Sequence, residues 1–178
     1  AVKTFQVALR IDTELDSKEG RAYDLRNLGQ AEHRLGRSDD AGKHLAESLA
    51  LSREIGNAYN ELKAVMALGE VQEDSQRPQD ARGAYTKGLE LARQLNVQEV
   101  EWQALYALGR LASAAGDDDT ARKFIAEKVS IEQRIANMAP GVKEGRKTYE
   151  YLRENLNTLQ DQLKQAKLKL AELRTRQK

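Results

Sequence analysis

The feature that most constrains the fold is an internal repeat of 40 residues. Leu28-Gly29 recurs as Leu68-Gly69 and again as Leu108-Gly109. Several further registers share this spacing, which is the signature of stacked structural units rather than of one globular core. These registers are Ala1, Ala41, Ala81 and Ala121; Leu9, Leu49, Leu89 and Val129; and Ile11, Leu51, Leu91 and Ile131.

Each repeat has the pattern of two helices separated by a short break. Residues of high helix propensity dominate, and no sustained alternation of apolar and polar residues predicts a strand. Gly36 is expected to end the first helix of the first hairpin, and Asp39 to cap the second helix. Pro78 is expected to occupy the first position of a helix in the second hairpin. The predicted helices span residues 19–35, 40–55, 58–74 and 98–115, with others starting at Pro78 and at Asp117-Asp118.

Glycines inside the first helix of each repeat predict a close contact between the paired helices. Gly29, Gly69 and Gly109 lie in helix interiors, where glycine costs about 1 kcal/mol relative to alanine. Their recurrence suggests that the second helix approaches too closely for a Cβ atom. The residues expected to face this contact are Ala41, Ala81 and Ala121, with Leu45, Tyr85 and Ile125 one turn further on.

The repeated pattern resembles the tetratricopeptide repeat. Leu25-x-x-Leu28-Gly29 followed by Ala41-x-x-x-Leu45 carries the resemblance, and the next two repeats follow it. The period of 40 exceeds the usual period of about 34. The longer period resembles the subclass found in LGN/Pins-type adaptors and in bacterial arrays that precede a CHAT protease domain. Where the family places an aromatic residue late in the first helix, this chain has Glu32, Gln72 and Ala112.

The resemblance implies an all-α, right-handed α-solenoid over residues 1–138. Its repeats are expected at 17–56, 57–96 and 97–138. Residues 1–16 align with the second helix of a repeat, so the chain is expected to start within a longer array. The alternative is a native N-terminal helix that caps the stack.

Residues 142–178 depart from the repeat after Pro140-Gly141. Their apolar residues follow alternating steps of three and four, which predicts a long helix with a heptad seam. We expect this seam to pack within the chain as a cap, and a coiled coil that self-associates is the alternative. The seam residues are Tyr149, Leu152, Leu156, Leu159, Leu163, Ala166, Leu170 and Leu173.

Composition and motifs argue against chemistry in this chain. The net charge of +1 gives no general argument for nucleic-acid binding, and the basic C-terminal tail is interpreted as a solvated helix face. The absence of cysteine excludes disulfides and fits a reducing, cytoplasmic compartment. His33 and His44, the two histidines, are expected on the surface. No catalytic, cofactor or metal site is predicted, and no apolar run is long enough for a membrane span.

The resemblance also implies a partner-binding groove, lined by the first helix of each repeat. Asn27 and Gln30 could hydrogen-bond a peptide backbone, and Arg26 and Arg110 could pair with a carboxylate. The residues expected to line this groove are Tyr23, Arg26, Asn27, Gln30, His33, Lys63, Met66, Glu70, Glu73, Gln103, Tyr106, Arg110 and Ser113.

Three functions are compatible with these features. The first is a protein-interaction scaffold, or adaptor, that binds a peptide or helical segment in the groove. The second is a regulatory module of a larger enzyme, such as a CHAT-type protease or a signalling protein. The third is an oligomerisation module that self-associates through residues 142–178.

Overall fold

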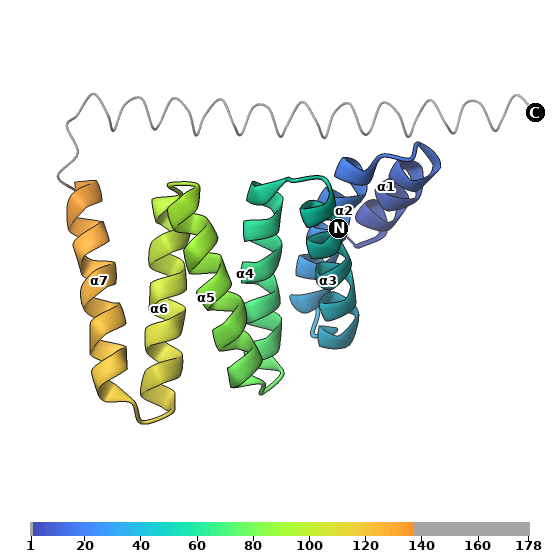
Figure 1. Cartoon of the computed structure of the whole chain (residues 1–178). Helices are drawn as coiled ribbons and strands as arrows, with labels where there is room; N and C mark the ends of the chain where they lie inside the picture. The colour runs from blue at the N-terminus through green and yellow to red at the C-terminus, as the bar shows by residue number, and fades with distance from the viewer. Residues whose placement is uncertain (1, 137–178) are drawn as a thin grey trace, which may run out of the picture. The chain divides into compact units, whose positions relative to one another are not determined.

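The computed structural model of the chain describes residues 2–136, which form the array of helices in Figure 1. Contacts divide the chain into a compact unit, Ala1–Gln133, and a second unit, Arg134–Lys178. The predicted heptad helix over 142–178 lies outside the described residues. The following paragraphs therefore concern the first unit and the remainder of its last helix.

Within residues 2–136 the secondary structure is entirely helical, which confirms an all-α array of hairpins. α1 precedes three helix pairs; the first helix of each pair (α2, α4, α6) is called an A helix and the second (α3, α5, α7) a B helix. None of the described helices is long and apolar enough to span a bilayer. The helices are α1 (Val2–Glu14), α2 (Lys18–His33), α3 (Ser38–Glu54), α4 (Ala58–Asp74), α5 (Pro78–Gln94), α6 (Gln98–Ala114) and α7 (Asp118–Ala136).

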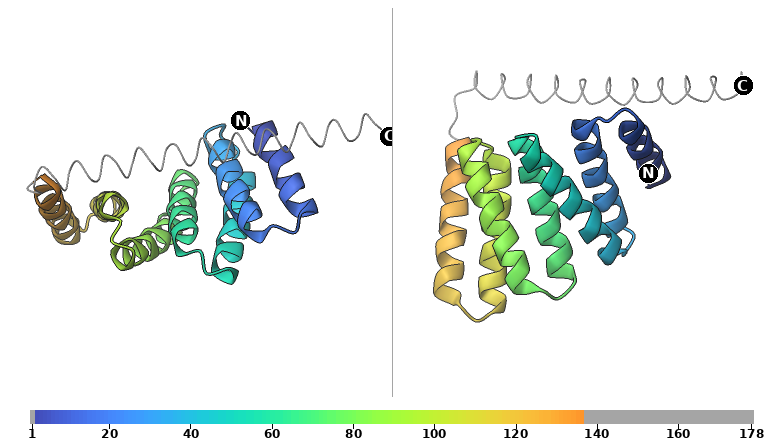
Figure 2. Two further views of the ribbon diagram at one scale, coloured as in Figure 1. Left: turned by 90° about the horizontal axis from the view of Figure 1, so that it is seen from above. Right: turned by 45° about the vertical axis from the view of Figure 1, so that its right-hand side comes forward.

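Consecutive helices pack against one another along the array. α2 also contacts α4, so these two A helices touch directly. Seen from above, α2, α4 and α6 follow one another on one side, and α3 and α5 on the other (Figure 2). α1 takes the position of a B helix, because its Leu9 packs on a cluster formed by Ala22, Leu25 and Leu51.

Every connection between helices uses the same tight turn, and these turns recur every 20 residues. Each of the helices α1–α6 ends in a Schellman-type motif, in which a residue in the left-handed region precedes an N–H that donates to a carbonyl five residues earlier. Glycine occupies the left-handed position in three of these six turns. The six residues are Asp16, Gly36, Gly56, Gln76, Asn96 and Gly116, with φ of 51, 74, 68, 58, 53 and 76°.

This turn explains one wrong prediction, the capping of α3 by Asp39. The helix begins at Ser38, and its N-cap position is Arg37, whose side chain makes no capping hydrogen bond. The backbone N–H of Arg37 donates to the carbonyl of Glu32 at 3.0 Å, which returns the chain to helix at once. Pro78 does start α5, and Asp117 accepts a hydrogen bond from the backbone of Thr120, as expected for a helix start.

The glycines inside the A helices lie against the B helices, which confirms the predicted close contact. A Cβ at Gly29 would lie 2.7 Å from Leu45 Cγ, and one at Gly69 would lie 2.7 Å from the ring of Tyr85. The third hairpin is looser. A Cβ at Gly109 would be 3.3 Å from Ile125, whose side chain is 47% exposed rather than buried.

The interface between the first hairpin and α4 is a buried polar network. Asn60 Nδ2 donates to Ser52 Oγ at 2.7 Å, to Ser48 Oγ at 3.3 Å and to the carbonyl oxygen of Ala22 at 3.2 Å. Ser48 Oγ donates to the same carbonyl at 2.6 Å, and Arg26 donates to Asn60 Oδ1 at 2.6 Å. The network joins α2, α3 and α4, and its groups satisfy one another away from water.

The interface between the second hairpin and α6 has no such network. One repeat later, the positions of Ser48, Ser52 and Asn60 are held by Gly88, Ala92 and Val100, all of which are buried. The position of Arg26 is held by Met66, whose sulfur lies against Gly88. This second interface is therefore stabilised by apolar burial and by the fit of Met66 against the glycine.

Candidate protein-binding surface

The predicted groove residues lie on the A helices, and their exposed face is called the α2–α4–α6 surface. It comprises Tyr23, Arg26, Asn27, Gln30 and His33 on α2; Lys63, Glu70 and Glu73 on α4; and Gln103, Tyr106, Arg110 and Ser113 on α6. Met66 is the exception among the predicted residues. Its side chain is buried beneath α5, so it supports the surface from within and offers nothing to a partner.

Glu73 links α4 to α5 and to α6. Its carboxylate accepts a hydrogen bond from the hydroxyl of Tyr85 on α5 at 3.0 Å and pairs with Arg110 on α6 at 2.8 Å. Burial, together with the negative charge of Glu73, raises the pKa of Tyr85 far above its usual value. The hydroxyl therefore stays protonated and donating, and Arg110 is held in place within the array.

Arg26 is also engaged within the chain. Besides its bond to Asn60, it donates to the side-chain oxygen of Asn27 at 3.3 Å. Its guanidinium lies 4.8 Å from the centroid of the Tyr23 ring, a cation–π distance. Both arginines predicted to bind a partner carboxylate thus already have partners, and that role stays a prediction.

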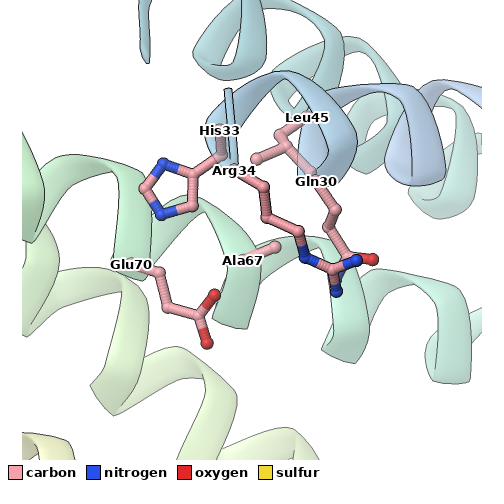
Figure 3. Close-up of a pocket in the computed structure, with 6 residues that line it drawn as sticks. All are labelled: Gln30, His33, Arg34, Leu45, Ala67 and Glu70. Atoms are coloured by element: carbon pink, nitrogen blue, oxygen red, sulfur yellow. The ribbon is translucent and has the colours of Figure 1, made fainter. Parts of the chain in front are cut away.

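A pocket of about 260 Å³ lies between the first hairpin and α4 (Figure 3). The buried side chains of Leu45 and Ala67 form its floor, because both belong to the apolar cluster between α3 and α4. The structure brings three of the predicted groove residues together here, from two A helices. The lining residues are Gln30, His33, Arg34, Leu45, Ala67 and Glu70.

Charge is unevenly compensated around this pocket. His33 Nε2 lies 3.3 Å from a carboxylate oxygen of Asp74. Desolvation raises the pKa of Glu70, the nearby His33 opposes this shift, and the carboxylate of Asp74 adds to it. Glu70 forms no ion pair or hydrogen bond with any residue of the described array. The positive charge of Arg34 also opposes the rise in the pKa of Glu70, but within residues 2–136 no cation is in direct contact with this carboxylate.

The third hairpin contributes a cluster of aromatic and basic side chains. Tyr106, which is 52% exposed, lies between Arg110 and Lys128, whose cationic ends are 5.9 and 5.8 Å from its ring centroid. Lys128 also lies 5.4 Å from the centroid of Trp102. Exposed tyrosine beside cations is a common composition of protein interfaces.

Two features of the site were missed by the sequence reasoning. Neither histidine is a simple surface residue, because His33 faces Asp74 and His44 Nδ1 lies 2.6 Å from the buried carboxylate of Glu32. Arg34 was not predicted to line the surface, since it follows the last residue of α2. The sequence carried one signal, and it concerned His44. Glu32 stands where the resembled pattern has an aromatic residue, and a carboxylate at a buried position requires a partner.

These observations define the class of protein: an array of helical hairpins whose A helices share one continuous face. Residues 19–94 match the tetratricopeptide repeat family. This segment is therefore similar to tetratricopeptide repeats, which are generally modules for protein–protein interaction. No curated protein matches the sequence.

Solved structures show the same fold at low sequence identity. BtubC (BKLC) from P. vanneervenii is 18% identical with a TM-score of 0.71, over 78% of this chain and 58% of that one. A Rap protein, in complex with competence and sporulation factor, is 18% identical with a TM-score of 0.70, over 76% and 38%. The TPR domain of Arabidopsis FLU is 18% identical with a TM-score of 0.59, over 66% and 98%. The chain thus spans little more than half the length of BtubC.

Proposed function

We propose that this protein is an interaction scaffold that binds a peptide or helical segment of a partner on the α2–α4–α6 surface. The observation that carries the proposal is the pocket between α2 and α4, where Gln30, His33 and Glu70 meet over an apolar floor. A concave site with a few convergent polar groups is the usual form of a recognition site. The family supports the same function, since its repeats generally bind proteins.

The surface offers two further features that suit a peptide. Tyr23 and Tyr106 lie at its two ends and are 36% and 52% exposed, and tyrosines of this kind often dominate binding energy. Between them, the Glu73–Arg110 pair and the Arg26–Asn60 bond fix the spacing of the A helices. A partner would therefore meet a surface that is already ordered, which lowers the entropic cost of binding.

A random-peptide selection on the full chain tests this proposal. A library of dodecapeptides displayed on phage is enriched on the wild-type protein, and the selected peptides are measured by fluorescence anisotropy. We expect Tyr23→Ala combined with Tyr106→Ala to weaken binding at least about tenfold, as expected for loss of two aromatic anchors. The helical circular dichroism should be unchanged.

The matched control replaces two exposed apolar residues outside this surface, Leu15 and Leu95, which lie in turns and are 59% and 37% exposed. Leu15→Ala with Leu95→Ala should bind the selected peptides like wild type. Equal binding by the tyrosine variant, or a selection that enriches no peptide over a blank surface, would overturn the proposal.

The narrower assignments remain proposals of the same kind. The 40-residue period supports the LGN/Pins-type and CHAT-associated subclass, and with it a role as a regulatory module within a larger enzyme. A cytoplasmic location is supported by the absence of cysteine. Self-association through residues 142–178 stays a prediction of the heptad pattern, since that segment lies outside the described residues.

A further inference from the structure

The charges of the α2–α4–α6 surface divide into those satisfied by the chain and those left over. Arg110 is paired with Glu73, Arg26 donates to two asparagines, and Asp74 faces His33. Glu70 is the carboxylate of this surface that has no such partner among the described residues. The sequence predicted that the arginines of this surface would bind a carboxylate of a partner. In the structure both arginines already have partners, and Glu70 is the carboxylate that remains available.

The surroundings of Glu70 favour a cation that carries an apolar stem. Glu70 and Arg34 flank Ala67 from two sides, and the space between them is the pocket (Figure 3). Leu45 and Ala67 supply an apolar floor on which methylene groups would be buried. Gln30 belongs to the same lining, and a side-chain amide of this kind can accept a further N–H.

We propose that this pocket receives a lysine or arginine side chain of the bound partner, with the cationic end on Glu70 and the methylene stem on Leu45 and Ala67. The inference rests on the proposed function, because it names the chemistry that a bound segment presents at one position. The alternative occupant, an anionic group on Arg34, is disfavoured because Glu70 lines the same pocket and the carboxylates of Asp74 and Glu73 act on it, so an anion would be repelled.

The protonation behaviour of Glu70 is consistent with this assignment. Desolvation raises its pKa, which means that the ionised carboxylate is held at a cost in the unbound protein. A cation delivered into the pocket would remove this cost and form a charge-assisted hydrogen bond. Arg34 acts in the opposite sense, since its positive charge repels an incoming cation.

The test is a double-mutant cycle between the protein and a selected peptide. The peptides come from the dodecapeptide selection described above, and the full chain carries Glu70 or Glu70→Gln. Each basic residue of a peptide is replaced in turn by norleucine, which keeps the methylene stem and removes the charge. We expect one replacement to weaken binding to wild type about tenfold and to have almost no effect on binding to Glu70→Gln.

Two further variants give predictions of opposite sign. Arg34→Gln should tighten binding of the same peptides about twofold or more, because a repelling charge is lost. Asp74→Asn removes a negative charge like that of Glu70, one helical turn further along α4. Because Asp74 already faces His33, the affinity should change less than about twofold at physiological salt. Loss of affinity in Arg34→Gln would favour an anionic occupant and overturn the inference.

The outcomes separate this inference from the proposed function. Peptides that bind through Tyr23 and Tyr106 yet show no coupling between a basic residue and Glu70 would overturn the inference and leave the scaffold function standing. Selected peptides without lysine or arginine would do the same. A selection that enriches no peptide would contradict both the inference and the proposed function. Coupling confined to one basic position of the peptide supports both.

Discussion

The first hairpin packs against α4 and the second hairpin packs against α6 through equivalent backbone positions. The side chains at these positions are polar in the first interface and apolar in the second. At the first interface Asn60 is the centre of a hydrogen-bond network that includes Ser48 and Ser52. At the second interface Val100 holds the position of Asn60, and Met66 lies against Gly88. The same packing geometry is thus reached once by mutual hydrogen bonding and once by apolar fit.

The difference shows what the fold requires at this position. Either a complete polar network or a close-packed apolar contact is acceptable, because both leave no buried group without a partner. A mixture of the two is not acceptable. The network also ties the position of α4 to the first hairpin, since the amide of Asn60 meets all its partners in one register only. The three predictions below test this comparison, from the largest expected effect to the smallest.

Asn60→Val, which copies the second interface into the first, should destabilise the array by about 2–4 kcal/mol. The substitution leaves the hydroxyls of Ser48 and Ser52 and the side chain of Arg26 without their shared partner. The measurement is the midpoint of urea unfolding followed by circular dichroism. Adding Ser48→Ala and Ser52→Ala to Asn60→Val should recover part of this loss, because the two hydroxyl oxygens that lost their N–H donor are removed together. A triple variant less stable than Asn60→Val would contradict the interpretation.

Gly88→Ser, the reverse exchange, should destabilise the second interface by about 1–3 kcal/mol. A side chain at this position meets the sulfur of Met66, and its hydroxyl enters an apolar contact. Gly83→Ser is the matched control on the same helix, because a Cβ there has no atom within 4 Å. The control should be neutral or slightly stabilising, since serine is the better helix former. Equal midpoints for the two serine variants would show that the apolar fit contributes little.

The turns are common to both interfaces, so changes there should not distinguish them. Gln76 and Asn96 have φ of 58 and 53°, a region that glycine adopts without steric cost. Gln76→Gly should stabilise the array by about 0.5–1 kcal/mol, and Asn96→Gly by less, because asparagine tolerates this region. Thermal unfolding measures both. Arg77→Gly, at φ of −112°, is the control and should give no gain. A loss of stability in Gln76→Gly would show that the left-handed position carries little strain.

The repeat, the hairpins and the glycine contacts were predictable because they depend on residues that recur every 40 positions. The 20-residue spacing of the turns was not. Glycine marks the left-handed position at Gly36, Gly56 and Gly116 only, whereas Gln76 and Asn96 give no such signal. The packing of the helices imposes the conformation there against the local preference of the side chain.

The location of the site was more predictable than its electrostatics. The repeat pattern placed Gln30, His33 and Glu70 on the A helices, and the structure gathers them at one pocket. The occupation of Arg110 by Glu73 and the burial of Met66 could not be predicted in this way. Each depends on a side chain from a neighbouring helix that varies between repeats, so periodicity alone carries no information about the pairing.

Identical connections at 20-residue intervals mean that the backbone does not distinguish the turn within a hairpin from the link between hairpins. The alternation of A and B helices is therefore determined by the side chains at their contacts. Gly29 and Gly69 lie on the A helices, and Leu45 and Tyr85 lie on the B helices. Inserting a single helix within such an array would join smoothly at the turns and still place two like faces in contact. Insertions and deletions inside the array are consequently tolerated only in whole pairs, whichever link is cut.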